Sequence, residues 1–316
     1  MKRDNYRLDV VIPCYNEDDA LPNTIPRLAS FLDDLINNDD IHVSRYRLIL
    51  VDDGSTDKTW QLIERLSKNF PILGIKLSRN YGHQNAMLAG LSNTDNEVVL
   101  TIDADLQDDL NAISDMLKAY QGGADLALGV RSSRGNDTSF KRSSASIYYK
   151  LTKALGVNII ENHADFRLMS RKSLTALLAH EEVNLFLRGI IPTIGFPTSI
   201  IYYERQDREY GETKYTLRKM LSLALNGITS FSVTPLRLVT VLGLAVSAAA
   251  FIAAFWVIFV KMFFYGHAVP GWASTVLPIL FLGGIQLLSL GIIGEYIGKI
   301  YLEVKRRPRF IIEKMT

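Results

Sequence analysis

Residues 98–108 read VVLTIDADLQD, and this stretch decides how the chain folds. An apolar run leads directly into Asp103, Asp105 and Asp108, with Gln107 among them. A short run rich in Val, Leu and Ile is typical of a strand buried in a parallel sheet, and in such sheets ligands bind beyond the carboxyl ends of the strands. The stretch therefore predicts a buried strand that ends in ligand-binding side chains.

The chain on both sides of this stretch repeats the pattern. Other apolar runs rich in Val, Ile and Leu occupy residues 8–13, 47–52, 72–77 and 125–129. Segments of helical character alternate with these runs, such as 57–69 and 109–120. Alternating strands and helices predict an α/β fold, with a Rossmann-like, mostly parallel sheet covered by helices on both faces.

Polar residues stand at the ends of four predicted strands, in segments 13–17, 52–55, 78–82 and 103–108. Each segment alone also suits a turn or a helix cap, as Asp53-Gly54 does. The carboxyl ends of parallel strands lie at the same edge of a sheet, so we expect the four segments to converge on one crevice.

Asp103 and Asp105 are candidate metal ligands. If the strand stays regular, their side chains face the same way, and their oxygens suit Mg²⁺ or Mn²⁺ bridging a diphosphate. The sequence has no glycine-rich phosphate loop, so metal and side chains must hold a nucleotide. Arg131, after the fifth predicted strand, suits a phosphate, although an exposed arginine in the basic stretch 131–142 is an equally good interpretation.

Composition narrows the class of protein. The net charge of +2 over 316 residues does not indicate a protein that binds nucleic acid. Cys14 is the only cysteine, so no disulfide can form within the chain and we expect a reducing compartment. Residues 1–9 lack the apolar stretch of a secretory signal, which predicts that this part of the chain stays in the cytoplasm.

Two stretches near the C-terminus, residues 238–260 and 274–293, carry no charge. Each is long enough to cross a hydrocarbon core of about 30 Å as a helix, the alternative being a pair of buried core helices. Basic residues lie outside the pair, at Arg218, Lys219, Arg237, Lys305, Arg306, Arg307 and Arg309. The positive-inside rule then predicts a multi-pass protein of the inner (plasma) membrane, with the α/β domain and both termini cytoplasmic.

An amphipathic pattern over residues 214–231 precedes the first predicted span. It fits a helix lying in the membrane interface, or a soluble helix packed on the domain. Glycines in the second span and its exit permit close helix packing, so a homo-oligomer is possible. The predicted divisions are an α/β domain over 1–212, a juxtamembrane amphipathic region over 213–236, a transmembrane hairpin over 237–298 and a basic cytoplasmic tail over 299–316.

These segments together resemble family 2 glycosyltransferases of the GT-A fold, in the branch that uses polyprenyl phosphates. That branch includes bactoprenol glucosyltransferases, dolichyl-phosphate mannose synthase and the aminoarabinose transferase ArnC. The matching segments are VIPCYNE (11–17), VDDGSTD (51–57), RNYG (79–82), DADLQD (103–108), ADFRLM (164–169), REYGETKY (208–215) and GEYIG (294–298). The resemblance extends over nearly the whole chain, in the order of the family.

The resemblance implies a role for each matching residue. It implies donor-binding roles for Pro13, Tyr15, Glu17, Asp52 and Asp103. It implies Mg²⁺ or Mn²⁺ on Asp103, Asp105 and Gln107, and a catalytic set of Asp105, Asp165 and Arg131. It also implies that Arg208 and Lys214 grip the acceptor phosphate, although basic residues beside a membrane also bind anionic lipid.

The reaction that the resemblance implies is transfer of glucose from UDP-glucose to undecaprenyl phosphate, for later glycosylation of lipopolysaccharide or another cell-envelope glycan. A phosphate monoester has its second pKa at about 6, so it can attack in one inverting step without a strong base. Asp165 is then a base, a ligand of a sugar hydroxyl, or a structural partner of Arg167.

Other donors and another class of function remain open. UDP-galactose, UDP-N-acetylglucosamine and a modified arabinose donor fit the same motifs. A processive polysaccharide synthase would need a Gln-x-x-Arg-Trp segment, which the sequence lacks. A non-catalytic membrane sensor of nucleotide sugars is the alternative that Asp105→Ala would distinguish.

Overall fold

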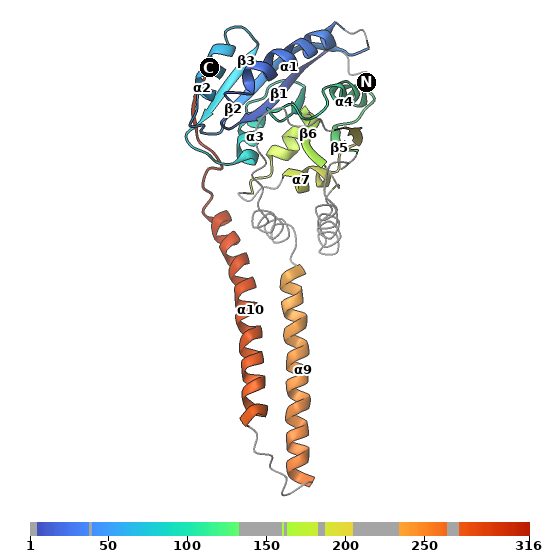
Figure 1. Cartoon of the computed structure of the whole chain (residues 1–316). Helices are drawn as coiled ribbons and strands as arrows, with labels where there is room; N and C mark the ends of the chain where they lie inside the picture. Colours follow the sequence, from blue (N-terminus) through green and yellow to red (C-terminus); the bar gives the residue numbers. More distant parts are fainter. Residues whose placement is uncertain are drawn as a thin grey trace.

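The computed structural model describes residues 5–37, 40–132, 160, 163–182, 187–204, 234–263 and 272–316. In this part of the chain, strands form one mixed sheet in the order β7-β5-β6-β4-β1-β2-β3-β8. Two long helices extend from one end of the α/β domain (Figure 1). The fold therefore has a globular part that holds the sheet and an elongated helical part.

The strands after which the polar segments follow run in one direction. β1 (Tyr6–Cys14) lies in the middle and pairs in parallel with β2 (Val43–Asp52) and β4 (Val98–Thr101), and β2 pairs in parallel with β3 (Ile72–Leu77). The register places Cys14 beside Asp52, and Val11 beside Thr101. This pairing brings the carboxyl ends of the four strands to one edge of the sheet.

The remaining strands make the sheet mixed. β6 (His163–Ser170) is antiparallel to both β4 and β5 (Leu126–Arg131), and β7 (Thr198–Tyr203) is parallel to β5. The predicted α/β sheet is confirmed, and the reversed β6 is a feature that strand–helix alternation did not predict. Because β6 runs the other way, its first residues, not its last, lie at the edge where β4 ends.

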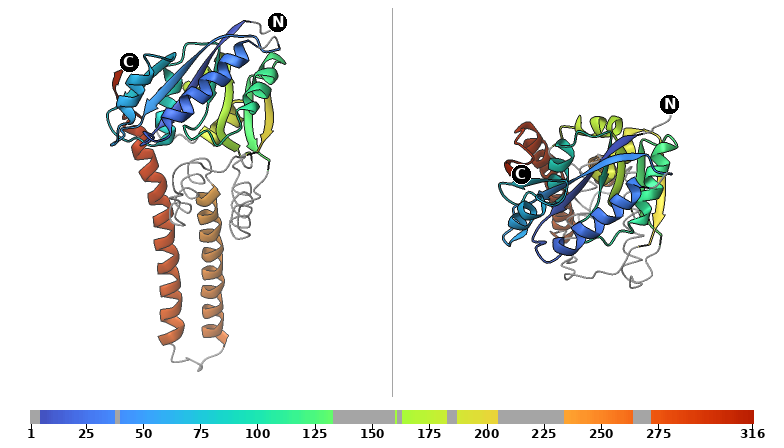
Figure 2. Two further views of the ribbon diagram at one scale, coloured as in Figure 1. Left: turned by 45° about the horizontal axis from the view of Figure 1, so that its top comes forward. Right: turned by 90° about the horizontal axis from the view of Figure 1, so that it is seen from above.

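Helices cover both faces of the sheet, as predicted (Figure 2). One face carries α1 (Leu21–Ile36), α2 (Thr59–Leu66) and α4 (Asn111–Gln121); the other carries α3 (His83–Ser92), α6 (Arg171–Leu178) and α7 (Leu187–Ile190). Successive strand residues point to opposite faces, so Val10 and Ile12 pack in one core and Val11 in the other. Burial on both faces explains the continuous apolar runs in the sequence.

The two helices outside the domain are α9 (Thr234–Phe263) and α10 (Trp272–Val304), of 30 and 33 residues. They run side by side away from the sheet (Figures 1 and 2). Large apolar side chains on both are exposed, including Phe251, Phe255 and Leu287. Among the described residues, one helical segment, Phe281–Val304, is long and apolar enough to span a membrane, and Leu236–Val246 is a shorter apolar segment.

The end of the chain returns to the sheet. Within the predicted basic tail, β8 (Ile312–Met315) pairs antiparallel with β3 and forms one edge of the sheet. The hydroxyl of Thr316 accepts a hydrogen bond of 2.9 Å from the amide of Gly74, and Lys314 Nζ lies 2.7 Å from Glu64 Oε1. The segment after α10 is thus fixed to the α/β domain.

Candidate active site

Backbone and side-chain hydrogen bonds lock the loops after β1 and β2 together. The amide of Asn16 donates to Ser55 Oγ at 3.0 Å, and the amide of Thr56 donates to Asn16 Oδ1 at 2.9 Å. The amide of Glu17 donates to Thr59 Oγ1 at 2.9 Å. These bonds hold segments 13–17 and 52–56 as one wall, on which the Tyr15 side chain is 47% exposed.

Two neighbouring carboxylates on this wall have different surroundings. Asp53 accepts hydrogen bonds from the amides of Tyr81 at 2.7 Å and Gly82 at 2.9 Å, so it fixes the loop between β3 and α3. Asp52 Oδ1 accepts from the amide of Ser55 at 2.9 Å. The other oxygen, Asp52 Oδ2, is buried without a hydrogen-bond partner in the described part of the chain. A buried acceptor of this kind suits a hydroxyl or N–H of a ligand.

Gly54 lets this wall approach the loop after β3. Its φ is +66°, and a Cβ there would lie 2.4 Å from the carbonyl carbon of Arg79 and 2.5 Å from the amide nitrogen of Asn80. Neither backbone atom can move without displacing the loop that Asp53 holds. The glycine of the Asp-Asp-Gly segment is therefore required by close backbone approach as well as by its positive φ.

We predict that Gly54→Ala lowers the free energy of unfolding by about 3 kcal/mol and weakens nucleotide-sugar binding, because strain and a backbone clash combine. Gly123→Ala is the matched control, since Gly123 also has a positive φ, +107°, but nothing lies within 4 Å of an added Cβ. It should lose only about 1 kcal/mol. Thermal denaturation of both variants measures the difference, and equal losses would contradict the role of the close approach.

Asp103 and Asp105 follow β4, at the edge of the sheet where the parallel strands end. Asp103 is partly buried, and its Oδ1 has no hydrogen-bond partner in the regions that the structure describes. Burial raises the pKa of Asp103, and the negative charges of Asp165 and Asp105 add to the effect. Asp105 Oδ1 accepts a hydrogen bond of 3.3 Å from the amide of Gln107, across a turn in which Leu106 has φ +44°.

This donor set fits a divalent cation that is completed by its substrate. No group of three or more His, Cys, Asp or Glu side chains arranged for a metal occurs in the described residues. Mg²⁺ is commonly held by one or two carboxylates together with substrate phosphates, so a full protein cage is not needed. Asp103 Oδ1 accepts no hydrogen bond within the described residues, and a second carboxylate lies near it, so a cation would stabilise this position.

A compact charge network lies next to these carboxylates and has Asp165 at its centre. Asp165, on β6, is paired with the buried Arg167, and Arg188 of α7 donates to both of its oxygens, from Nε at 3.2 Å and from Nη2 at 2.7 Å. His83, the first residue of α3, places Nε2 3.5 Å from Asp165 Oδ2 and 3.5 Å from Asp103 Oδ1. His83 thus links the predicted metal ligand to the predicted catalytic carboxylate.

The network determines the charges of its members. Burial opposes ionisation of Asp165, but Arg167, His83 and Arg188 outweigh it and hold the pKa of Asp165 well below its usual range. Burial also disfavours a charged His83, yet Asp165 and Asp103 raise the pKa of this imidazole above its ordinary value. An ionised Asp165 that is bound by two arginines, with His83 at 3.5 Å, is a poor proton acceptor, which favours its structural interpretation.

Arg131 ends β5, at the same edge of the sheet as the end of β4. Its Nε donates to the hydroxyl of Tyr203 at 3.4 Å, and its Nη2 lies 3.7 Å from Asp108 Oδ1. Tyr203 in turn donates a short hydrogen bond to Asp108. Burial raises the pKa of Asp108 to about 6, with the charge of Asp103 as the next cause. Asp108 and Tyr203 therefore orient a guanidinium that is 28% exposed at this edge.

The model of the family "Glycosyl transferase family 2" matches residues 9–178, which contain most of the sheet and the carboxylates described above. The chain belongs to glycosyl transferase family 2. This glycosyltransferase is 47% identical over 316 residues to the uncharacterized glycosyltransferase YkoT of Bacillus subtilis (strain 168), covering 99% of this chain and 93% of that protein. It is 38% identical to the prophage bactoprenol glucosyl transferase homolog of Escherichia coli (strain K12), covering 98% and 99%.

Among solved structures, glucosyl-3-phosphoglycerate synthase of Mycobacterium tuberculosis, in complex with Mn²⁺, UDP-glucose and phosphoglyceric acid, aligns with this glycosyltransferase at a TM-score of 0.45 and 15% identity. The alignment covers 71% of this chain and 78% of that chain. A likeness of this size supports no inference about ligands.

The structure of the glycosyltransferase gathers most of the predicted site residues at one edge of the sheet. The ends of β1 and β2 and the loop after β1 hold Pro13, Tyr15, Glu17 and Asp52, and the region around β4, β5 and β6 holds Asp103, Asp105, Gln107, Arg131 and Asp165. The predicted acceptor residues Arg208 and Lys214 lie outside the described residues, as does the amphipathic segment 214–231.

Sequence reasoning missed four residues of this site: His83, Asp108 as a partner of Arg131, Arg188 and Tyr203. His83 directly follows the predicted segment 78–82, so extending that segment by one residue would have included it. Arg188 stands in an apolar context, and no local pattern in the sequence indicates its contact with Asp165.

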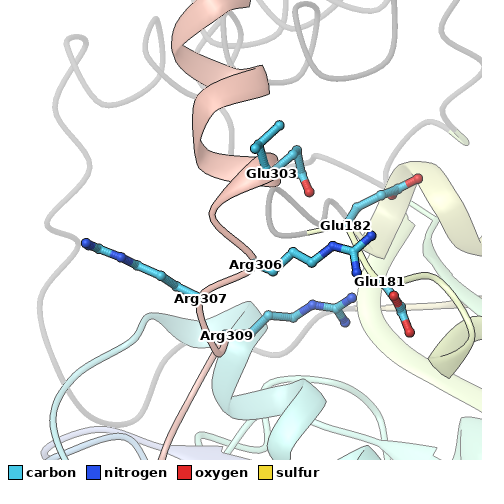
Figure 3. A pocket seen from close by; sticks show the side chains of 7 residues that line it. Glu181, Glu182, Glu303, Arg306, Arg307 and Arg309 are labelled. Carbon is cyan, nitrogen blue, oxygen red and sulfur yellow. The ribbon is translucent and has the colours of Figure 1, made fainter.

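A separate cavity of about 530 Å³ lies where α10 joins the α/β domain, lined by Glu181, Glu182, Glu303, Val304, Arg306, Arg307 and Arg309. Arg306 and Arg309 extend toward the two glutamates after α6, whereas Arg307 points away (Figure 3). None of these residues follows the carboxyl end of a parallel strand, so the cavity is distinct from the crevice of the glycosyltransferase.

Proposed function

We propose that this enzyme transfers a hexose, with glucose from UDP-glucose as the leading donor, to the phosphate of undecaprenyl phosphate, with inversion at the anomeric carbon. The observation that carries the proposal is the group of carboxylates at one edge of the sheet, in a domain from one end of which long helices with exposed apolar side chains extend (Figure 1). A lipid-linked acceptor accounts for both features in one molecule. The name bactoprenol glucosyl transferase, borne by a relative 38% identical over nearly the full length, supports the same acceptor.

The donor would occupy the wall formed by the loops after β1 and β2. Tyr15 offers an exposed aromatic ring on which a base can stack, and Pro13 and Glu17 flank it. Asp52 Oδ2, buried and without a hydrogen-bond partner in the described chain, would accept from the base or ribose. The donor's sugar would then extend toward Asp103 and Asp105.

Asp103, Asp105 and Gln107 would hold Mg²⁺ or Mn²⁺. Such an ion, when bound, stabilises the charge that develops on the departing diphosphate. Arg131, oriented by Asp108 and Tyr203, would contribute a bidentate contact to a phosphate. These side chains bind and orient the donor, and their loops already have fixed positions before the donor arrives.

The acceptor phosphate supplies its own nucleophile. One of its oxygens would attack the anomeric carbon as the bond from that carbon to the diphosphate oxygen breaks, which leaves the nucleoside diphosphate. A phosphate monoester with its second pKa at about 6 is largely dianionic at neutral pH, so no proton has to be removed. Asp165 is therefore free to act as the anchor of the charge network rather than as a base.

We further propose that α9 and α10 form a transmembrane hairpin. Helices of 30 and 33 residues extend about 45 and 50 Å, more than the thickness of the hydrocarbon core. Both helices lie at the same end of the α/β domain (Figure 1). The start of α9 and the end of α10, which are the ends near that domain, are therefore on one side of the membrane. With basic residues beyond both, the proposed arrangement has residues 1–212 and 299–316 in the cytoplasm and 213–236 at the membrane surface.

The test uses purified full-length protein in detergent with undecaprenyl phosphate and a panel of labelled nucleotide sugars. We expect a charged lipid-linked product with UDP-glucose, a much smaller amount with UDP-galactose or UDP-N-acetylglucosamine, and none with undecaprenol, which lacks the phosphate. Transfer from a different donor would change only the assignment of the sugar and leave the proposed acceptor and reaction unchanged. Absence of any lipid-linked product with every donor would overturn the proposed function.

A further inference from the structure

Arg188 is the residue of the charge network best placed to bind an incoming anion. Its side chain is 41% exposed, whereas Asp165 is 9% and Arg167 1% exposed. The short helix α7 that carries it lies at the end of the domain from which α9 and α10 extend (Figure 1). Arg188 therefore combines a contact with the network and a partly exposed side chain, on a helix at the end of the domain from which α9 and α10 extend (Figure 1).

The backbone around Arg188 is fixed in place. The neighbouring Leu187 is 1% exposed and packs in the core on the α3 face of the sheet. Its amide donates to Gln84 Oε1 at 3.3 Å, which ties α7 to the residue after His83. The guanidinium can thus change partners by side-chain rotation while the helix keeps its position.

Arg188 can release Asp165 without leaving that carboxylate unpaired. Asp165 keeps Arg167 as a counterion in the protein interior, and His83 remains 3.5 Å from its other oxygen. Arg167 keeps the Asp165 carboxylate paired, and an incoming phosphate takes the place of Asp165 as a partner of Arg188, so the exchange leaves neither charge unpaired. The buried Arg167 has no such freedom, because leaving a buried charge unpaired is strongly unfavourable.

A second guanidinium, that of Arg131, lies at the same edge of the sheet and is also partly exposed. Burial opposes its charge, but Tyr203 and Asp108 outweigh this effect and the weaker opposing effect of Arg188, so the pKa of Arg131 is raised. Each guanidinium can bind two phosphate oxygens at once, so two anions can be bound here, the donor's diphosphate at Arg131 and a second phosphate at Arg188.

We propose that Arg188 exchanges one contact with Asp165 for the phosphate of the lipid acceptor, and so positions the attacking oxygen beside the donor. This inference rests on the proposed function, of which it names the acceptor site. The donor's diphosphate is the other source of phosphate, but it would lie on the side of Asp103, Asp105 and Arg131. No covalent bond to Arg188 forms or breaks in the reaction.

The kinetic test compares Arg188→Gln, Arg188→Lys and the control Arg7→Gln. Arg7 also pairs with a carboxylate, Glu97 at 3.0 Å, but it lies at the start of β1, away from the crevice. Arg188→Gln should raise the KM for undecaprenyl phosphate by about 10- to 100-fold while changing the KM for the nucleotide sugar by less than about twofold. Arg188→Lys, which keeps the charge but not the bidentate geometry, should fall between it and wild type.

A binding measurement without turnover distinguishes a wrong assignment of Arg188 from a wrong proposed function. Fluorescence titration of wild type and Arg188→Gln with polyprenyl phosphate and with polyprenol should show tighter binding of the phosphate by wild type only, and calorimetry with UDP and Mn²⁺ should give equal affinities for both proteins. Weaker UDP binding by Arg188→Gln, or unchanged binding of the lipid phosphate, would overturn the assignment of Arg188. Failure of wild type to transfer any sugar would overturn the proposed function, and the binding result would still decide on Arg188. If Arg188→Gln does not fold, Arg188→Lys decides by the same two measurements.

Discussion

Asp105→Ala is expected to lower the kcat/KM of sugar transfer by about 10³-fold while the protein stays folded. Asp105 lies in the turn after β4 and is partly exposed, so its removal leaves no large cavity. Its carboxylate is one of the two that would share a cation with the donor diphosphate. Loss of that cation removes the main stabilisation of the leaving group, and the measurement is the initial rate of lipid-linked product formation at saturating Mn²⁺.

Asp109→Asn is the matched control for Asp105→Ala. Asp109 belongs to the same loop, and its Oδ1 accepts a hydrogen bond of 3.0 Å from the amide of Asn111 at the start of α4. Asparagine keeps an oxygen for that bond, so only the charge is lost. The control should retain activity within about threefold of wild type. Comparable losses in the two variants would indicate that general acidity of the loop, rather than a specific carboxylate, supports transfer.

Asp165→Asn is expected to destabilise the fold by about 3–5 kcal/mol, because it leaves the buried Arg167 without its counterion. The predicted fall in the midpoint of thermal denaturation is about 10 °C. The pKa of Asp165 is lowered in the folded protein, so its stabilising contribution is present above the ordinary pKa of an aspartate and is lost as pH falls through the folded value. The difference between variant and wild type should therefore be full at pH 7 and shrink only in acid.

The double variant Asp165→Asn with Arg167→Met distinguishes a structural from a catalytic Asp165. It removes both members of the buried pair, and an apolar replacement of similar volume is often tolerated. Its thermal midpoint should recover most of the loss. A single variant that keeps the stability of wild type but loses all activity would instead assign Asp165 the role of a base, against the charge network described above.

The strands that bear the site could be predicted because they are buried on both faces. Val98–Thr101 and the runs before Cys14 and Asp52 read as continuous apolar segments, and each ends in polar residues. Parallel order then brings those ends together without further information. This is why the proximity of segments 13–17 and 52–55 and the position of Asp103 and Asp105 at the sheet edge could be predicted from the sequence.

The parts that could not be predicted depend on contacts between distant segments. β6 holds Asp165 and Arg167 in its interior, and an apolar pattern cannot show that two opposite charges are buried against each other. β8 is a short edge strand with exposed charged residues, so its sequence resembles a tail. His83 and Arg188 join the site only because α3 and α7 pack on the same face of the sheet.

The central claim is that Asp103 and Asp105 share a divalent cation with the diphosphate of a sugar nucleotide. Mn²⁺ binding followed by electron paramagnetic resonance, with and without UDP, tests it most directly. Wild type should bind Mn²⁺ weakly alone and at least about tenfold more tightly with UDP, and Asp105→Ala should lose the enhancement. Mn²⁺ binding that is unaffected by UDP, together with full sugar transfer in the presence of a chelator, would contradict the account.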